Sequence, residues 1–196
     1  MEMTGEQLIP ASQAATWKAS NDPDFLKQCV PGCESIDRVS DTEFLVNMTA
    51  RVGPVSAKFK GKMQLSDLKP PHSYALAFEG QGGVAGFAKG SALVALAPEG
   101  DATKLSYKVK ANIGGKLAQI GSRLVDAAAN KVANDFFNAF NQRMAAMHGA
   151  AATVHHDHHA EPIPRDPELP DVSQASLAFF AAGALVVFVV ALLTLF

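Results

Sequence analysis

Five consecutive residues near the end of the chain carry side chains that bind metal ions: His155, His156, Asp157, His158 and His159. Four imidazoles and a carboxylate could hold Zn²⁺ or Ni²⁺ loosely. A structural or catalytic metal site needs ligands that surrounding groups orient, and the proline-rich sequence around this tract offers none. We interpret the tract as a polar spacer that gains positive charge on mild acidification. Metal binding is the alternative.

Two cysteines, Cys29 and Cys33, flank a Val-Pro-Gly turn. Zinc takes four ligands, and the sequence has no second cysteine pair. A redox pair normally has two residues between its cysteines and stands beside a helix N-terminus. We therefore predict two reduced, partly buried thiols on either side of a turn.

The densest glycine run, residues 80–90, contains the letters G-x-G-x-x-A of a dinucleotide-binding turn. That chemistry requires a strand-to-helix junction, so that the helix N-terminus meets the pyrophosphate. Here both flanking segments read as strands. The run is therefore predicted to supply a bulge, a sharp bend or a flexible flap.

The sequence shows no set of residues for nucleophilic or acid–base catalysis. Four of the six histidines lie in the histidine tract at 155–159, and no paired carboxylates bracket a recognisable site. We predict that the protein is not an enzyme. Catalysis inside an internal cavity is the alternative.

Composition narrows the function further. The 196 residues include 17 Lys+Arg and 19 Asp+Glu, a net charge of −2, which argues against a nucleic-acid partner because such proteins need a basic stripe. The 48% hydrophobic content is enough for a packed core. Residues 1–10 lack a basic start followed by an apolar run, so we expect no export signal and a domain facing the cytoplasm.

The chain divides into three parts. Residues 177–196 are uncharged and proline-free, and a helix of this length spans roughly 30 Å, the thickness of a bilayer core. We predict a transmembrane anchor over 175–196, which places the protein at the cytoplasmic membrane; a buried helix of a soluble core is the alternative. Residues 149–174 carry four prolines and are predicted to be a flexible linker. Residues 1–148 form the domain.

Within the domain, apolar and polar residues alternate over 44–52, 55–65, 73–79, 91–97 and 103–113. This period is typical of strands with one buried and one wet face, and short turns between them indicate an antiparallel meander. A further strand and two short helices precede the meander. The period changes to 3.6 after residue 115, which predicts one long amphipathic helix from 116 to 147. The expected class is α+β, a curved antiparallel sheet wrapped around the long C-terminal helix.

Small inward residues could leave a cavity between the sheet and the helix: Ala92, Ala95, Ala111 and Ala128. The same pattern also fits a solid core. Ten larger residues on the inward faces are the candidate ligand-binding residues: Phe44, Val46, Met48, Phe59, Met63, Phe78, Tyr107, Leu124, Phe136 and Phe140.

The opposite face of the predicted sheet carries six lysines: Lys58, Lys60, Lys62, Lys104, Lys108 and Lys110. We interpret these lysines as a basic, solvated face. Attraction to anionic lipid or to an acidic partner is the functional alternative.

Several motifs together resemble one known family. They are Pro31-Gly32-Cys33-Glu34-Ser35, Val52-Gly53-Pro54-Val55, Phe59-Lys60-Gly61, Gly86-Phe87-Ala88-Lys89-Gly90 and the run Gly115 to Arg123. The sequence is similar to the family of the CoxG subunit of carbon monoxide dehydrogenase, within the START-like, helix-grip (SRPBCC) superfamily. The similarity covers essentially the whole globular part, and the family includes members with and without a hydrophobic tail.

This resemblance implies a helix-grip fold with an apolar cavity and an accessory role beside an aerobic molybdenum-containing CO dehydrogenase or a related hydroxylase. Molybdenum, flavin and iron–sulfur groups would belong to the partner subunits. We expect a membrane tether that binds a hydrophobic molecule, a quinone or another lipid, and no covalently bound cofactor. A membrane-bound assembly factor without a ligand is the alternative.

Overall fold

The computed structural model describes residues 1–52 and 55–152 of the chain. Its elements, in chain order, are β1 (Glu2–Ile9), α1 (Gln13–Ala19), α2 (Pro23–Lys27), β2 (Cys33–Arg38), β3 (Glu43–Val52), β4 (Val55–Lys69), β5 (Ser73–Gln81), the 3₁₀ helix η1 (Gly83–Ala85), β6 (Phe87–Glu99), β7 (Ala102–Gly114), α3 (Lys116–Gln119) and α4 (Ser122–Ala152). The predicted order, a strand and two short helices followed by an antiparallel meander and a helical C-terminal part, is confirmed.

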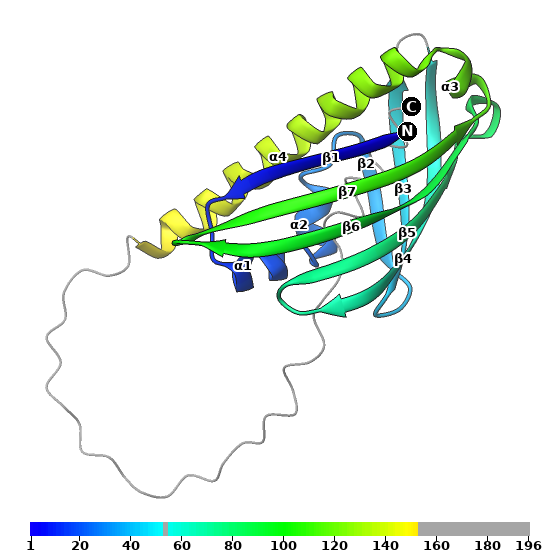
Figure 1. Cartoon of the computed structure of the whole chain (residues 1–196). Helices are drawn as coiled ribbons and strands as arrows, with labels where there is room; N and C mark the ends of the chain where they lie inside the picture. Colours follow the sequence, from blue (N-terminus) through cyan, green and yellow to red (C-terminus); the bar gives the residue numbers. More distant parts are fainter. Residues whose placement is uncertain (53–54, 153–196) are drawn as a thin grey trace, which may run out of the picture.

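The strands form one seven-stranded antiparallel sheet in the order β1-β7-β6-β5-β4-β3-β2. The first strand of the chain therefore pairs with the last, although about 100 residues separate them. Figure 1 shows the sheet curving around α4, which runs along its inner face. Because the sheet is curved, its inner face can surround the apolar side of a single helix, and the α+β helix-grip architecture follows.

The inner and outer faces of the sheet follow the predicted alternation. In β7, Leu105, Tyr107 and Val109 are buried, whereas Ser106 and Lys108 between them point to the outer face. Register pairs inner residues with inner residues across the strands, as in Met63 opposite Phe78. Apolar side chains are thereby gathered on one surface, the arrangement that burial against α4 requires.

The structure has two helices where the sequence pattern predicts one long helix over residues 116–147. Gly121, with φ of +94°, separates α3 from α4, so residues 116–147 are not one helix. The break resets the helical phase, and Val125 and Ala129 are buried instead of Leu124, which is 57% exposed. The assignment of Leu124 to the inner face was therefore wrong.

Two short helices close the end of the sheet opposite α3. The Ser12 hydroxyl caps α1, and the Asp22 carboxylate accepts bonds from two backbone amides at the start of α2. Trp17 of α1 is buried and packs edge-on against Tyr74 of β5, with ring centroids 5.6 Å apart. This contact attaches the helical segment to the inner face of the sheet.

The glycine run joins β5 to β6, as predicted, through the single turn η1. β6 begins at Phe87, four residues earlier than the alternation indicated. Gly86, with φ of +123°, lies so close to β7 that an added Cβ would stand 2.0 Å from the Gly114 carbonyl oxygen. The glycines thus let the β5–β6 connection pack directly against the chain that leads into α3.

Residues 153–196 lie outside the described residues, and the predicted anchor and the histidine tract lie among them. α4 continues to Ala152, four residues into the segment predicted as linker. Among the helices of the described part, none is long and apolar enough to cross a membrane.

Substituting Gly86 by Ala should destabilise the domain by at least about 2 kcal/mol more than the matched change Gly83→Ala. Both positions have positive φ, but the space around Gly83 is open, whereas the Gly86 methyl group would meet a backbone carbonyl. Urea unfolding followed by circular dichroism measures both. Equal losses in the two variants would show that the close approach is not rigid.

Candidate functional site

The structure brings nine of the ten candidate ligand-binding residues together in the core between the sheet and α4. The nine are at most 8% exposed: Phe44, Val46, Met48, Phe59, Met63, Phe78, Tyr107, Phe136 and Phe140. Leu124 alone lies outside, on the exposed side of the first turn of α4. The candidate site is therefore the apolar interior.

Aromatic rings from α4 occupy much of this interior. Phe137 stacks on Tyr107 of β7 with centroids 5.7 Å apart, and Phe136 meets both Phe137 and Phe140 at 5.2 and 5.6 Å. Phe140 also contacts Phe25 of α2 edge-on. Phe140 lies four residues after Phe136 and three after Phe137, a spacing that places the rings on the face of α4 toward the sheet. Phe137 was missed in the sequence, although its position three residues before Phe140 gave a signal.

Smaller side chains line the other end of the interior, near the start of α4. Ala129 and Ala133 are buried there, and Ala111 and Ala128 are partly buried against the core. Ala92 is buried as predicted, but Ala95 is exposed on the outer face, because it follows Val94 in the alternation of β6. Ala95 was therefore wrongly assigned to the interior.

A hollow of about 330 Å³ opens between this end of α4 and the edge of the sheet. Its lining includes Ala111 and Ile113 of β7, Ala118 of α3 and Val125 of α4. Met1 borders the hollow as well, and its amino group donates to the Ala111 carbonyl at 3.0 Å. We call this hollow the mouth. Polar residues, Glu2, Asn112 and Asp126, line it together with the apolar ones.

The outer face of the sheet has a larger groove of about 720 Å³. Small residues, Ala77, Gly90 and Ser91, form its floor, and longer polar side chains such as Lys62 and Lys110 stand around it. Of the ten candidates, Phe78 borders this groove, and Tyr107 borders a second outer hollow of about 510 Å³. The other seven buried candidates line none of these three hollows. The mouth and the outer groove share Met1, Glu2, Ala111 and Asn112 in their linings.

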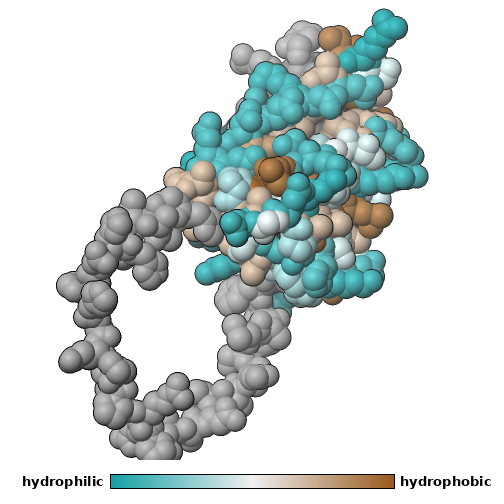
Figure 2. All heavy atoms as spheres, turned by 60° about the vertical axis from the view of Figure 1, so that its left-hand side comes forward, coloured by the Kyte–Doolittle hydropathy of each residue, from teal (hydrophilic) through white to brown (hydrophobic). Residues whose placement is uncertain are grey.

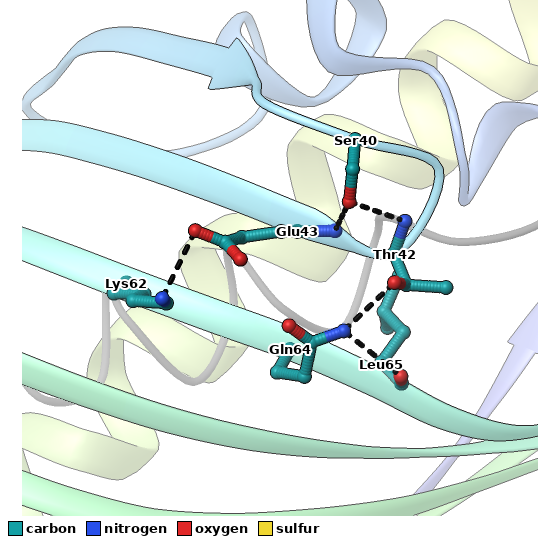
Figure 3. A network of polar contacts seen from close by, with 6 residues as sticks. All are labelled: Ser40, Thr42, Glu43, Lys62, Gln64 and Leu65. Atoms are coloured by element: carbon teal, nitrogen blue, oxygen red, sulfur yellow. Dashed lines mark hydrogen bonds and ion pairs between the residues drawn. The ribbon is translucent and has the colours of Figure 1, made fainter.

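A polar network holds one wall of the outer groove (Figure 3). The Ser40 hydroxyl accepts from the Thr42 and Glu43 amides, which shapes the β2–β3 turn. Gln64 of β4 donates to the Thr42 hydroxyl at 2.7 Å, and Lys62 forms an ion pair with Glu43 at 3.0 Å. These bonds fix the turn to β4.

The outer lysines do not form the uniformly basic face predicted from the sequence. Four of the six pair with glutamates at 2.8–3.3 Å. Lys62–Glu43, Lys104–Glu6 and Lys110–Glu2 join neighbouring strands, whereas Lys58–Glu34 reaches from β4 across β3 to β2. The predicted basic face is therefore a mixed one. The face of the molecule in Figure 2 is likewise mostly hydrophilic, with apolar side chains in small separate groups.

Hydrogen bonds and charge lower the pKa of three of these glutamates, Glu2, Glu6 and Glu34. Lys110 lowers the pKa of Glu2 and Lys104 lowers that of Glu6, in each case chiefly by donating a hydrogen bond. The Thr49 hydroxyl and then Lys58 lower the pKa of Glu34. These groups are exposed, so the pairs order the outer face more than they stabilise the fold.

Both cysteines are free, as predicted. Cys29 Sγ donates to the Phe25 carbonyl at 3.3 Å, and burial raises the pKa of both thiols to about 11. The nucleophilic thiolate form is therefore scarce at neutral pH. Within residues 1–52 and 55–152, no group of three or more His, Cys, Asp or Glu side chains is placed to hold a metal ion.

Comparison with known proteins identifies the family. The family model for the CoxG subunit of carbon monoxide dehydrogenase matches residues 5–145, nearly the whole described domain. The chain belongs to the CoxG family. This confirms the resemblance seen in the motifs, and CoxG proteins are accessory subunits, generally without catalytic activity. No curated protein matches the chain.

Solved structures confirm the fold expected for a CoxG protein. A conserved protein from Geobacillus kaustophilus is 27% identical, with a TM-score of 0.70 over 74% of this chain and 96% of that chain. The Zhui aromatase/cyclase from Streptomyces sp. R1128 is 11% identical, with a TM-score of 0.59 over 77% and 97%. TTHA0849 from Thermus thermophilus is 16% identical, with a TM-score of 0.57 over 75% and 99%. The last two likenesses concern the fold alone.

Truncating Phe136 to Ala should cost about 3–5 kcal/mol of unfolding free energy, because its ring is 1% exposed between α4 and the sheet. Leu124→Ala, on the exposed side of the same helix, should cost less than about 0.5 kcal/mol. Urea titrations of the two variants test the helical phase described here. A large loss for Leu124→Ala would contradict it.

The thiols should be protected from alkylation in the folded protein. At pH 8 we expect a reaction on the order of 100-fold slower than in urea, since a pKa raised by about two units reduces the thiolate fraction by that factor. The raised pKa also predicts a pH dependence of stability. The contribution of the two thiols to the free energy of unfolding is fully present below about pH 9 and is lost as the pH rises toward 11. Iodoacetamide labelling followed by mass spectrometry measures the rate. Equal rates in the folded and unfolded protein would refute the burial of these thiols.

Proposed function

We propose that this protein is a membrane-tethered accessory subunit of an aerobic, molybdenum-containing CO dehydrogenase or a related hydroxylase, and that it binds a hydrophobic molecule such as a quinone. The observation that carries the proposal is the CoxG family match over residues 5–145. The apolar segment 177–196 supports the tether, with the domain on the cytoplasmic side of the membrane.

A physical need links the two halves of the proposal. Electrons from a water-soluble oxidoreductase must reach an acceptor that is dissolved in lipid. A domain that has an apolar interior and is tethered to the bilayer can take up such an acceptor and present it to the enzyme. Each buried CH₂ of a prenyl chain contributes about 0.8 kcal/mol, so a few isoprene units are enough to hold it.

The mouth is the entry that the geometry favours. It lies where Ala118 and Val125 leave room beside the partly buried Ala111, and the small side chains Ala129 and Ala133 continue inward from it. The aromatic rings of Phe136, Phe137 and Phe140 close the far end. A ligand entering here would lie along α4, and the nine buried candidate residues would surround it.

A second function has one observation in its favour. The rings at the far end already pack against one another and against β7, as in a solid core. A protein with such a core would act as a membrane-bound assembly factor that contacts the oxidoreductase without carrying a ligand. The two functions differ in whether the mouth binds a quinone.

Blocking the mouth should separate the two functions. If a quinone binds there, Ala111→Leu should weaken binding of decylubiquinone at least about tenfold, because the larger side chain narrows the opening. Ala95→Leu, a matched change on the exposed outer face, should leave binding unchanged. Native mass spectrometry of residues 1–152 measures the bound fraction; the Geobacillus kaustophilus structure, 96% of which this domain covers, supports using the domain alone.

Decylubiquinone that fails to bind the unaltered domain would reject the carrier and leave the assembly factor. The tether is tested separately, in cells that produce both this protein and the oxidoreductase. Deleting residues 175–196 should move the oxidoreductase from the membrane fraction to the soluble fraction, and an unchanged distribution would contradict tethering.

A further inference from the structure

The end of the domain that carries the mouth also exposes large apolar side chains. Val84 of η1 is 84% exposed, Phe87 at the start of β6 is 40% exposed, and Leu124 in the first turn of α4 is 57% exposed. Figure 1 shows the β5–β6 connection, α3 and the start of α4 at one end of the molecule, away from the end of α4 at Ala152. We call this end the tip.

The tip is a fixed feature of the fold. Ala85, next to Val84, is 2% exposed, and the Gly82 amide donates to the Gly86 carbonyl at 2.8 Å to close the turn. The close approach of Gly86 to Gly115 holds this turn against the chain entering α3. The backbone on both sides of Val84 is therefore fixed, and it keeps the Val84 side chain in water. Exposure of this apolar side chain costs free energy unless another apolar surface covers it.

Basic side chains accompany the apolar ones. Lys116 of α3 and Arg123 of α4 are exposed, and neither has an ion pair among the residues that the structure describes. The acidic groups nearby are Asp126 on α4 and Glu2, of which Glu2 is already paired with Lys110. Apolar residues flanked by cations are the combination that suits the surface of an anionic bilayer.

The length of chain outside the structure permits this contact. α4 has 31 residues and is about 46 Å long, so the tip and the exit of the tail at Ala152 are about that far apart. The 24 residues 153–176 can extend over at most about 80 Å. A domain anchored through residues 177–196 can therefore turn its tip toward the same membrane.

We propose that the tip docks on anionic lipid, with Val84, Phe87 and Leu124 entering the interface and Lys116 and Arg123 facing the headgroups. The inference rests on the proposed function, because docking in this orientation directs the mouth, bordered by Ala118 and Ser122 of α3 and α4, at the lipid. A lipid-soluble ligand then passes between bilayer and interior without crossing bulk water.

A fluorescent label tests the contact directly. Val84→Cys in the full chain is labelled at neutral pH with an NBD maleimide, to which the native thiols, with pKa values of about 11, react poorly. On phosphatidylcholine vesicles with about 30% phosphatidylglycerol, we expect a blue-shifted emission that doxyl-labelled lipids quench. The matched control is Leu93→Cys, 59% exposed on the outer face of β6, where we expect no shift.

Charge provides a second comparison. When Lys116 and Arg123 are both replaced by Glu, the fraction of the Val84 label with blue-shifted emission should fall about tenfold. Replacing Lys60, an exposed lysine of the outer face, by Glu should leave this fraction unchanged. Raising the salt concentration should weaken the shift in the same way. A Val84 emission that matches that of Leu93, both in the full chain and in residues 1–152, overturns the proposal.

The tether and the tip can fail separately in this experiment. Full chain that floats with vesicles while the Val84 label stays unshifted rejects the tip alone. A full chain that floats no better than residues 1–152, with the Val84 label still shifted, rejects the tether and supports the tip. A Val84 label that shifts only when the oxidoreductase is added, in the absence of vesicles, assigns the tip to a protein partner and overturns the proposal.

Discussion

The packing of α4 against the curved sheet is the contact on which the rest of the structure depends. Apolar and polar residues alternate along each strand, and this alternation gives the sheet an apolar inner face and a polar outer face. The inner face must be covered along its whole length. α4 covers it with a row of phenylalanines toward Ala152 and with alanines toward Gly121. The same helix therefore supplies a filled end, which stabilises the domain, and a looser end, where the mouth opens.

In the docking that we propose, the tip connects this architecture to the membrane. The glycines that bring η1 against the entry to α3 also determine where Val84 is exposed, so one set of backbone contacts positions both the mouth and the apolar residues beside it. The outer face differs from the tip, because four of its lysines form ion pairs with glutamates on other strands of the sheet. Within the part of the chain that the structure describes, the tip combines exposed apolar groups with two cations, Lys116 and Arg123, that form no ion pair.

Much of the fold and of the interior could be predicted from the sequence, because alternation within one strand is a local pattern. Phe44, Val46 and Met48 show it in β3 and are buried as expected. Leu124 was misplaced because one residue with positive φ, Gly121, resets the helical phase; the Gly-Ser pair at 121–122 is a signal that could have indicated it. The Glu2–Lys110 pair depends on a register between distant segments, which no local pattern contains.

The way α4 is attached has a mechanical consequence. The inter-strand hydrogen bonds run only between neighbouring strands of the sheet, whereas side chains, such as Asn141 bonded to the Leu8 carbonyl, join α4 to it. A tilt of α4 pivoting at Gly121 would enlarge the interior and leave every strand-to-strand bond intact. If the interior takes up a ligand as proposed, its volume would therefore depend on how far α4 tilts, and the sheet would keep its shape for ligands of different size.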